Sequence, residues 1–267
     1  MDHRGLDADG CFEREGSLGR VAPLFRPVVA AARERIAQAY GGRLHSAYLY
    51  GSLPRGTARP GRSDLDLLLA LHRGPAAEDR DIAEVLGAGL DADFPQIDGV
   101  GILLHGRDRL LSEPERYDLG WFVACLCTPL LGADLAEHLP RYRPDTVLAR
   151  ETNGDLAELL PGWRARVREA STPPEYRALS RTLARKLVRT GFTLVMPRWG
   201  GWTSDLAESA EVFGRYYPRR AAQMREAASV ALEPVADPAV PRAYVEDLGP
   251  WLAAEYTARH GRRTPRP

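Results

Sequence analysis

The chain has 267 residues, 29.5 kDa and 44% hydrophobic residues, which suits one large domain or two modest ones with a real core. Its formal net charge is zero and its pI about 7, so no global field attracts nucleic acid or an anionic membrane. No apolar run approaches the roughly 20 residues of a membrane span, and the first residues lack the apolar stretch of a signal peptide, so we expect a cytoplasmic protein.

The first part of the chain has the pattern of an α/β domain. Residues 1–20 are polar and predict a loose arm, and residues 21–112 then alternate between helical and strand patterns. Apolar spacing near 3.6 predicts helices, and short apolar runs bounded by turn residues predict buried strands. The expected helices are 21–40 and 76–90, and the expected strands are 44–51, 64–71 and 96–105.

Beyond residue 112 the pattern changes to helical runs separated by Pro and Gly. We predict an all-helical second domain over residues 113–260, which includes a helix through "PERYDLGWFVACLCTPLLG", and a frayed basic tail over residues 261–267. The cysteines, Cys11, Cys125 and Cys127, form no CxxC pair and are expected to be reduced thiols. The histidines have neither metal-ligand nor catalytic-triad spacing.

Two carboxylates stand at the beginning of an otherwise apolar strand. Asp64 and Asp66 are two residues apart, so their side chains project from the same face, with Leu65 turned to the other. Adjacent carboxylates repel each other, and a divalent cation is their natural counter-charge. Mg²⁺ accepts a few carboxylate oxygens and keeps positions for water and phosphate oxygens, so the pair predicts a site for a metal–nucleotide complex. Taken alone, a DxD triplet is more often a solvated strand end.

The loop before this strand offers groups for an anion. Gly51 ends the preceding strand and Ser52 can begin a short helix, so backbone N–H groups and the Ser hydroxyl can meet a phosphate. The guanidinium groups of Arg55, Arg59 and Arg62 can add positive charge. Each feature also has an ordinary structural reading as a turn or a solvated loop, and the argument for function depends on their arrangement.

In this arrangement, "YGSLPRGTARPGRSDLDL" resembles the DNA polymerase β-like nucleotidyltransferase superfamily, whose signature is Gly-Ser followed after about ten residues by Asp-x-Asp or Asp-x-Glu. The resemblance implies a mixed sheet with packed helices, two Mg²⁺ ions, and transfer of a nucleoside monophosphate from an NTP, with ATP as the expected donor. The acceptor is a hydroxyl group, and pyrophosphate is released. It also implies that Asp64 and Asp66 hold metal and that Gly51, Ser52, Arg55 and Ser63 contact the nucleotide.

The superfamily also has a third acid on a later strand beside the pair. Asp98 in "QIDGVGIL" is the candidate, because it opens the next apolar strand, whereas Asp91 and Asp93 fall on the preceding helix or its loop. In this role Asp98 completes the metal site and takes the proton of the acceptor. The alternative is that Asp98 is only a turn residue that begins a strand.

The helical half is similar to that of the streptomycin and spectinomycin adenylyltransferases. "DLGWFVACLCTPLLGADLAEHL" resembles their first long helix, and "LSRTLARKLVRTGFTLV" with "TSDLAESAEVF" resembles a later helix pair. The similarity implies that Arg185 faces the nucleotide phosphates. Ser204 occupies the position of a nucleotide-contacting lysine, so Lys186 or Arg198 would have to replace that contact.

The acceptor is left open by the sequence. A small hydroxylated molecule such as an aminoglycoside antibiotic is the first hypothesis, since acids are available to bind ammonium groups. The second is a protein or RNA acceptor, although the neutral charge and the lack of a basic stripe argue against nucleic acid. The third is a non-catalytic nucleotide-binding module of the antitoxin or regulatory kind. The acids considered for the first hypothesis are Glu113, Glu115, Asp118, Asp155, Glu158 and Asp205.

Overall fold

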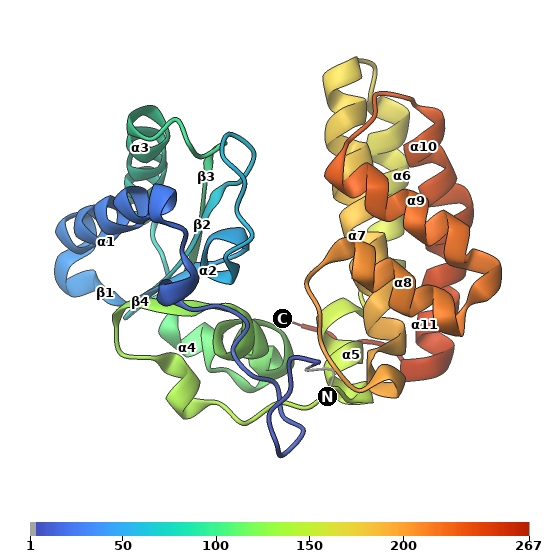
Figure 1. Cartoon of the computed structure of the whole chain (residues 1–267), viewed down its shortest axis with the longest axis horizontal. Helices are drawn as coiled ribbons and strands as arrows, with labels where there is room; N and C mark the ends of the chain where they lie inside the picture. The colour runs from blue at the N-terminus through green and yellow to red at the C-terminus, as the bar shows by residue number, and fades with distance from the viewer. Residues whose placement is uncertain (1–3, 267) are drawn as a thin grey trace. The chain divides into compact units, whose positions relative to one another are not determined.

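The computed structural model describes residues 4–266 as two compact units. Residues 13–141 form an α/β unit, and residues 142–266 together with residues 4–12 form a helical unit. The predicted order, an α/β domain followed by an all-helical region, is therefore confirmed (Figure 1).

The α/β unit contains a four-stranded mixed sheet with the strand order β3-β2-β1-β4. Strand β1 (Leu44–Tyr50) is antiparallel to β2 (Leu65–Leu71) and to β4 (Thr128–Gly132), whereas β2 is parallel to β3 (Val100–Gly106). The parallel pair is joined by α3 (Ala77–Asp93), as a parallel crossover requires.

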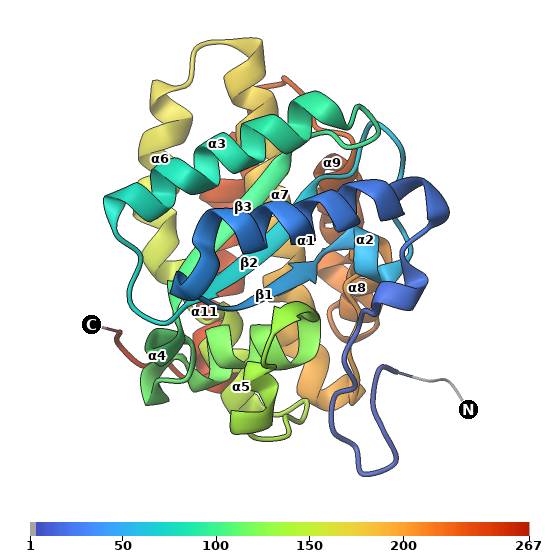
Figure 2. The same cartoon turned by 90° about the vertical axis from the view of Figure 1, so that its left-hand side faces the viewer.

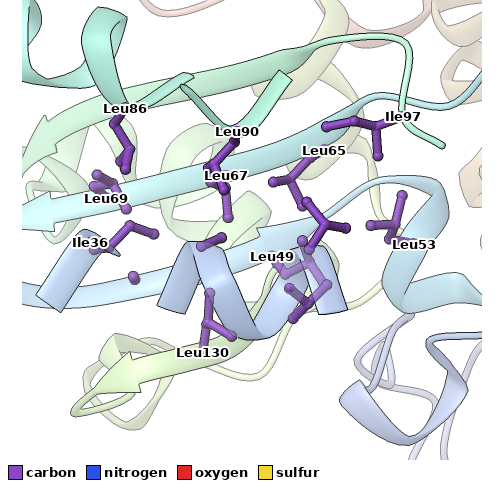
Figure 3. Close-up of a cluster of buried hydrophobic side chains, with 14 of the residues drawn as sticks. Ile36, Leu49, Leu53, Leu65, Leu67, Leu69, Leu86, Leu90, Ile97 and Leu130 are labelled. Carbon is purple, nitrogen blue, oxygen red and sulfur yellow. The ribbon is translucent and has the colours of Figure 1, made fainter. Parts of the chain in front are cut away.

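One face of this sheet is covered by α3 and α1 (Arg26–Tyr40), which lie across the strands in Figure 2. Strand alternation directs Leu65, Leu67 and Leu69 to this face, where they are fully buried among helix residues such as Ile36 (Figure 3). This cluster is the main core of the unit, because it joins both helices to the central strands.

The opposite face is covered by short helical segments that follow β3. They pack against Tyr48, Leu68 and Ala70, which point to this side. The segments are α4 (Arg107–Leu110), the 3-10 turn η4 (Glu113–Glu115), the π-helical turns η5 (Arg116–Gly120) and η6 (Phe122–Leu126), and the 3-10 turn η7 (Leu135–His138).

The helix predicted through residues 114–132 is wrong at its C-terminal end, whereas its earlier residues form helical turns. Residues 128–132 form β4, which adds an edge strand beside β1. Because of this pairing the α/β unit extends to residue 141, and the structure does not divide at the predicted position 112. A short apolar run such as "TPLL" fits a helix or a strand, and its pairing with β1 decides between them.

The helical unit is arranged around α7 (Pro173–Trp199), whose buried residues are distributed all round the helix. Helices α5, α6, α8, α9, α10 and α11 all contact it. These are α5 (Thr146–Asn153), α6 (Leu156–Glu169), α8 (Leu206–Tyr216), α9 (Ala221–Leu232), α10 (Ala239–Ala243) and α11 (Gly249–His260), with the 3-10 turn η8 (Pro218–Arg220) before α9 and the π-helical turn η9 (Tyr244–Leu248) before α11.

The described part of the N-terminal arm is attached to the helical unit, contrary to the prediction of a loose arm. The Trp202 amide donates to the Arg4 carbonyl at 2.8 Å, and the Arg4 guanidinium lies over the Trp199 ring. Farther along, the Phe12 amide donates to the Tyr142 carbonyl at 2.8 Å. These contacts pair segments far apart in sequence, which local periodicity does not reveal.

The C-terminal tail is also held by the helical unit, so the described residues 261–266 are not frayed. Arg263 forms an ion pair with Asp155 at 3.3 Å, and the Thr264 hydroxyl donates to Glu151 at 2.9 Å. The Arg266 guanidinium donates to the Glu151 carbonyl at 3.1 Å. The basic residues of the tail therefore pair with acids and carbonyls of the helical unit.

The remaining composition-based predictions concern membranes and thiols. In residues 4–266, no helix combines the length and apolar character needed to cross a bilayer. Cys11, Cys125 and Cys127 are buried and are not joined in disulfides, which agrees with the prediction of reduced thiols.

We expect Leu67→Ala to lower the free energy of unfolding by about 2–5 kcal/mol, because it leaves a cavity in the core beneath α1 and α3. Leu67 is 0% exposed. Val85→Ala is the matched control: Val85 is 75% exposed on α3, and its truncation should change stability by less than about 0.5 kcal/mol. Urea unfolding followed by circular dichroism compares the two variants, and equal effects would contradict the assigned core.

Candidate active site

The two carboxylates lie at the end of the sheet where β2 begins. Asp66 is on β2, paired with Tyr50 of β1 on one side and with Gly101 of β3 on the other. Asp64 directly precedes the strand. Alternation directs both aspartates to the face that carries Leu68, away from the main core. Both side chains are partly exposed, so the strand carries them at the boundary between the buried sheet and solvent.

Glycines surround these carboxylates. A Cβ atom on Gly51 would lie 2.4 Å from Asp66 Oδ2, and one on Gly101 would lie 3.2 Å from Asp66 Oδ1. A Cβ on Gly99 would lie 3.8 Å from Asp64 Oδ1. The carboxylate of Asp66 therefore occupies space that a side chain at position 51 or 101 would fill.

The turn after β1 has the predicted Gly-Ser form. Gly51 has φ 81°, which glycine adopts without strain, and it is followed by α2 (Ser52–Arg55), a single helical turn ended by Gly56 at φ 77°. Gly51 thus serves two purposes. Its positive φ lets the chain turn, and its lack of a side chain leaves space for the Asp66 carboxylate. The Arg55 guanidinium lies 3.5 Å from the Glu15 carboxylate, so its charge is shared with a residue of the N-terminal segment.

The loop between α2 and β2 is closed by Ser63, whose hydroxyl accepts a hydrogen bond from the Arg59 amide at 2.9 Å. Ser63 therefore holds the loop in its conformation. The side chains of Arg59 and Arg62 are exposed and make no ion pair or hydrogen bond within residues 4–266. Their charges are available to an anion that approaches the aspartates.

Asp98 lies in the loop before β3, close to the level of Asp64 in the pairing of β2 with β3, but it is not part of the strand. The Asp98 amide donates to the Ser63 carbonyl at 3.1 Å, and the Leu65 amide donates to the Gly99 carbonyl at 2.9 Å. The pairing therefore sets Gly99, rather than Asp98, beside Asp64. Asp98 is exposed in the loop before β3. Asp93, the next acid considered, ends α3 and pairs with Arg35 of α1.

The donor groups of Asp64 and Asp66 determine which metal ion they could hold. In the part of the chain that the structure describes, no group of three or more His, Cys, Asp and Glu side chains could hold a metal ion. Asp98 therefore does not form a three-carboxylate cluster with Asp64 and Asp66 in this conformation. Two carboxylates on one face, with space provided by glycines, still fit Mg²⁺, which takes one or two protein carboxylates and completes its shell with water and phosphate oxygens.

The predicted nucleotide contacts of the helical unit are on and after α7. Arg185 is a half-buried residue of α7. Ser204 accepts a hydrogen bond from the Trp202 indole at 3.3 Å in the loop before α8. Of the two residues considered as replacements for a lysine there, Lys186 pairs with Asp155 at 2.6 Å, and Arg198 lies over the Tyr216 ring at 4.4 Å. Both cations are therefore already engaged within the helical unit.

Several acids considered for a cationic acceptor are engaged as well. Glu113 pairs with Arg116 at 2.7 Å, and the buried Glu115 pairs with Arg109 at 3.2 Å. Asp205 accepts a hydrogen bond from the Glu208 amide at the beginning of α8. Asp155 is paired with Lys186 and Arg263, as described above. An ammonium group would have to break these contacts to use these carboxylates.

Sequence reasoning missed the residues whose small size shapes the site. Gly99 and Gly101 leave the β3 side of the aspartates without side chains. The sequence "DGVG" could have indicated this, because alternating glycines at the beginning of a strand are typical of a close approach by another group. Glu15 was also missed, and no local pattern links it to Arg55.

Comparison with known proteins agrees with this geometry. Residues 30–94 match the family model described as a nucleotidyltransferase domain, and this range contains most of α1, the Gly-Ser turn and both aspartates. A search of curated proteins found no match. Among solved structures, the chain is similar to spectinomycin adenyltransferase AAD(9) from Enterococcus faecialis with ATP and spectinomycin, at a TM-score of 0.55 and 14% identity, over 86% of this chain and 98% of that one.

At 14% identity the structural match establishes the fold of both units, whereas the family model covers the segment that carries the motif. Residues 30–94 therefore resemble a nucleotidyltransferase domain, and the chain has the fold of the spectinomycin adenyltransferase.

Proposed function

We propose that this protein is a nucleotidyltransferase that transfers a nucleoside monophosphate, with ATP as donor, to a hydroxyl group of a small molecule. The observation that supports it best is the placement of Asp64 and Asp66 on one face at the end of the sheet, beside the Gly51-Ser52 turn. This arrangement lies inside the segment that matches the nucleotidyltransferase domain.

In the proposed mechanism, Asp64 and Asp66 would hold Mg²⁺, and the ion would neutralise charge that develops on the phosphate oxygens. The Gly51-Ser52 turn binds the distal phosphates, and Arg59 and Arg62 add charge from the loop. Ser63 keeps this loop closed through the Arg59 amide. The contribution of the chain is mainly to position the acceptor oxygen in line with the α-phosphorus.

Asp98 is the proposed general base, which takes the proton of the acceptor hydroxyl. It is exposed and held one residue from Gly99, which lies beside Asp64. In the structure Asp98 is outside the aspartate pair, so in this proposal it removes a proton and is not a third metal ligand. Arg185 is proposed to contact the nucleotide from the helical unit.

The choice of acceptor depends on whether acidic side chains are available to bind a cationic molecule. The solved neighbour was crystallised with spectinomycin, so an antibiotic acceptor is one hypothesis for this chain. However, Glu113, Glu115 and Asp155 are neutralised by ion pairs, so a polycation gains little from them. We therefore place neutral hydroxylated compounds beside aminoglycosides as candidate acceptors.

The test of the function is a labelling experiment. The protein is incubated with α-³²P-labelled ATP and Mg²⁺ against aminoglycosides, spectinomycin, neutral sugar-containing antibiotics and, separately, a whole-cell protein extract and RNA. We expect label on a small molecule. Label found only on protein or RNA would favour the second hypothesis, and no ATP consumption with any acceptor would favour a non-catalytic module.

Nucleotide binding should depend on a divalent cation, because two carboxylates repel a triphosphate that carries no metal. Calorimetry with ATP is expected to give measurable binding with Mg²⁺ or Mn²⁺ and little binding with a chelator. The Asp64→Asn/Asp66→Asn double variant serves as the comparison, since it should lose the metal dependence. Equal affinity of the native protein with and without metal would remove the role assigned to the pair.

The roles of the three aspartates can be separated by kinetics. Asp66→Asn should lower kcat/KM by at least about 100-fold and weaken metal–nucleotide binding, because it removes a carboxylate that would hold Mg²⁺ beside the transferred phosphate. Asp98→Asn should lower kcat by roughly 100-fold or more and keep nucleotide binding, as loss of a general base does. Asp91→Asn is the matched control, since Asp91 is exposed on α3. Near-normal turnover of Asp98→Asn would rule it out as the base.

A further inference from the structure

A cavity lies at the end of the central strands opposite Asp64 and Asp66. It is lined by residues that follow β2 (Arg73, Gly74), by the end of β3 (His105), by the first turn of α3 (Arg80) and by α4 (Arg109), and its volume is about 320 Å³. Strands β2 and β3 have seven residues each, so this cavity is roughly 20 Å from Asp64 and Asp66. All of its residues belong to the α/β unit.

The cavity is lined by three guanidinium groups that make few contacts with the rest of the described chain. Arg73 and Arg80 are exposed, and their side chains make no ion pair or hydrogen bond with any residue of the described chain. Arg109 binds Glu115 through Nε and Nη2, at 3.4 and 3.2 Å, which leaves Nη1 without a hydrogen bond inside residues 4–266. Three guanidinium groups thus face a cavity in which Asp108 is the lining carboxylate.

The Arg109 side chain is fixed in place although it is 63% exposed, because the carboxylate of Glu115 is only 8% exposed and Arg109 is its partner. Removal of a buried charge from its partner is costly, so this pair stays formed. The remaining guanidinium edge of Arg109 therefore has a defined direction, which reduces the entropy lost when it binds a ligand.

His105 adds a neutral hydrogen-bonding group to the same cavity. Burial is the main cause that lowers the pKa of its imidazole, and the nearby Arg109 guanidinium lowers it further, whereas Glu115 opposes the shift. The imidazole is therefore mostly neutral at pH 7 and can donate one hydrogen bond while it adds no charge. A ligand that carries negative charge would reverse the effect of Arg109 and raise this pKa.

We propose that this cavity is a binding site for a phosphate group, either free phosphate or the phosphate of a small molecule, held by Arg73, Arg80 and Arg109. A tetrahedral dianion can accept charge-assisted hydrogen bonds from several guanidinium groups at once, which a monovalent carboxylate or chloride does less well. A nucleic acid is a poorer occupant, because the cavity is small and the chain has zero net charge. The site is separate from the proposed catalytic aspartates and independent of their function.

The test is an NMR titration of the full chain without nucleotide or Mg²⁺, at constant ionic strength. The His105 imidazole signal is assigned with the His105→Gln variant and followed with inorganic phosphate, with glucose 6-phosphate and with chloride. We expect a saturable shift with a phosphate compound and none with chloride. Tighter binding of glucose 6-phosphate would indicate a phosphorylated small molecule, and equal or tighter binding of inorganic phosphate would indicate the free ion.

The variant that decides the proposal is Arg73→Ala/Arg80→Ala. It should weaken phosphate binding at least about tenfold, because it removes two charge-assisted contacts. Both side chains are exposed and unpartnered among the described residues, so thermal unfolding should be unchanged. Arg33→Ala, at an exposed arginine of α1 outside the cavity, should leave the affinity within twofold. Unchanged affinity in the double variant, or no saturable shift with either phosphate, would overturn the proposal.

Discussion

The carboxylate of Asp66 imposes the main constraint on the α/β unit. A charged group cannot be buried in an apolar core without a partner, so the end of the sheet that carries it has to remain accessible. The same strand must still bury Leu65, Leu67 and Leu69 on its other face. Strand alternation satisfies both requirements, because it directs the leucines toward α1 and α3 and the aspartates to the opposite side. Glycines at 51 and 101 then make the space that a carboxylate between two strands needs.

The parallel pairing of β2 and β3 gives the sheet two polar ends with different charges. The strands begin together near Asp64 and Asp66, and they end together near Arg73 and His105. Between these ends the strand residues are largely apolar, so the main core fixes the register that brings each polar group to its place. A shift of β2 by one residue would direct the aspartates into the main core and Leu65, Leu67 and Leu69 to the opposite face. Core packing and site geometry are thus set by the same contacts.

Much of this arrangement was predictable from the sequence, because it depends on local patterns. The Gly-Ser turn, the alternation of Asp64 and Asp66 and the strands around them follow from periodicity and glycine positions, and the structure and the family match confirm them. Strand β4 could not be predicted, because its pairing with β1 is a contact between distant segments. The same holds for the arm and the tail, whose partners are Trp202 and Glu151. The register that sets Gly99 beside Asp64 likewise becomes visible only in three dimensions.

The ion pairs of the helical unit limit which of its cations can bind a phosphate. Lys186 is the single lysine of the chain, and it binds Asp155 at 2.6 Å together with Asn153. Arg263 of the tail shares the same carboxylate, so two cations surround one largely buried acid. A nucleotide phosphate that recruited Lys186 would have to separate it from Asp155 and leave that carboxylate with Arg263 alone. Since breaking a buried pair is costly, Lys186 is better suited to hold Asp155 than to bind a phosphate.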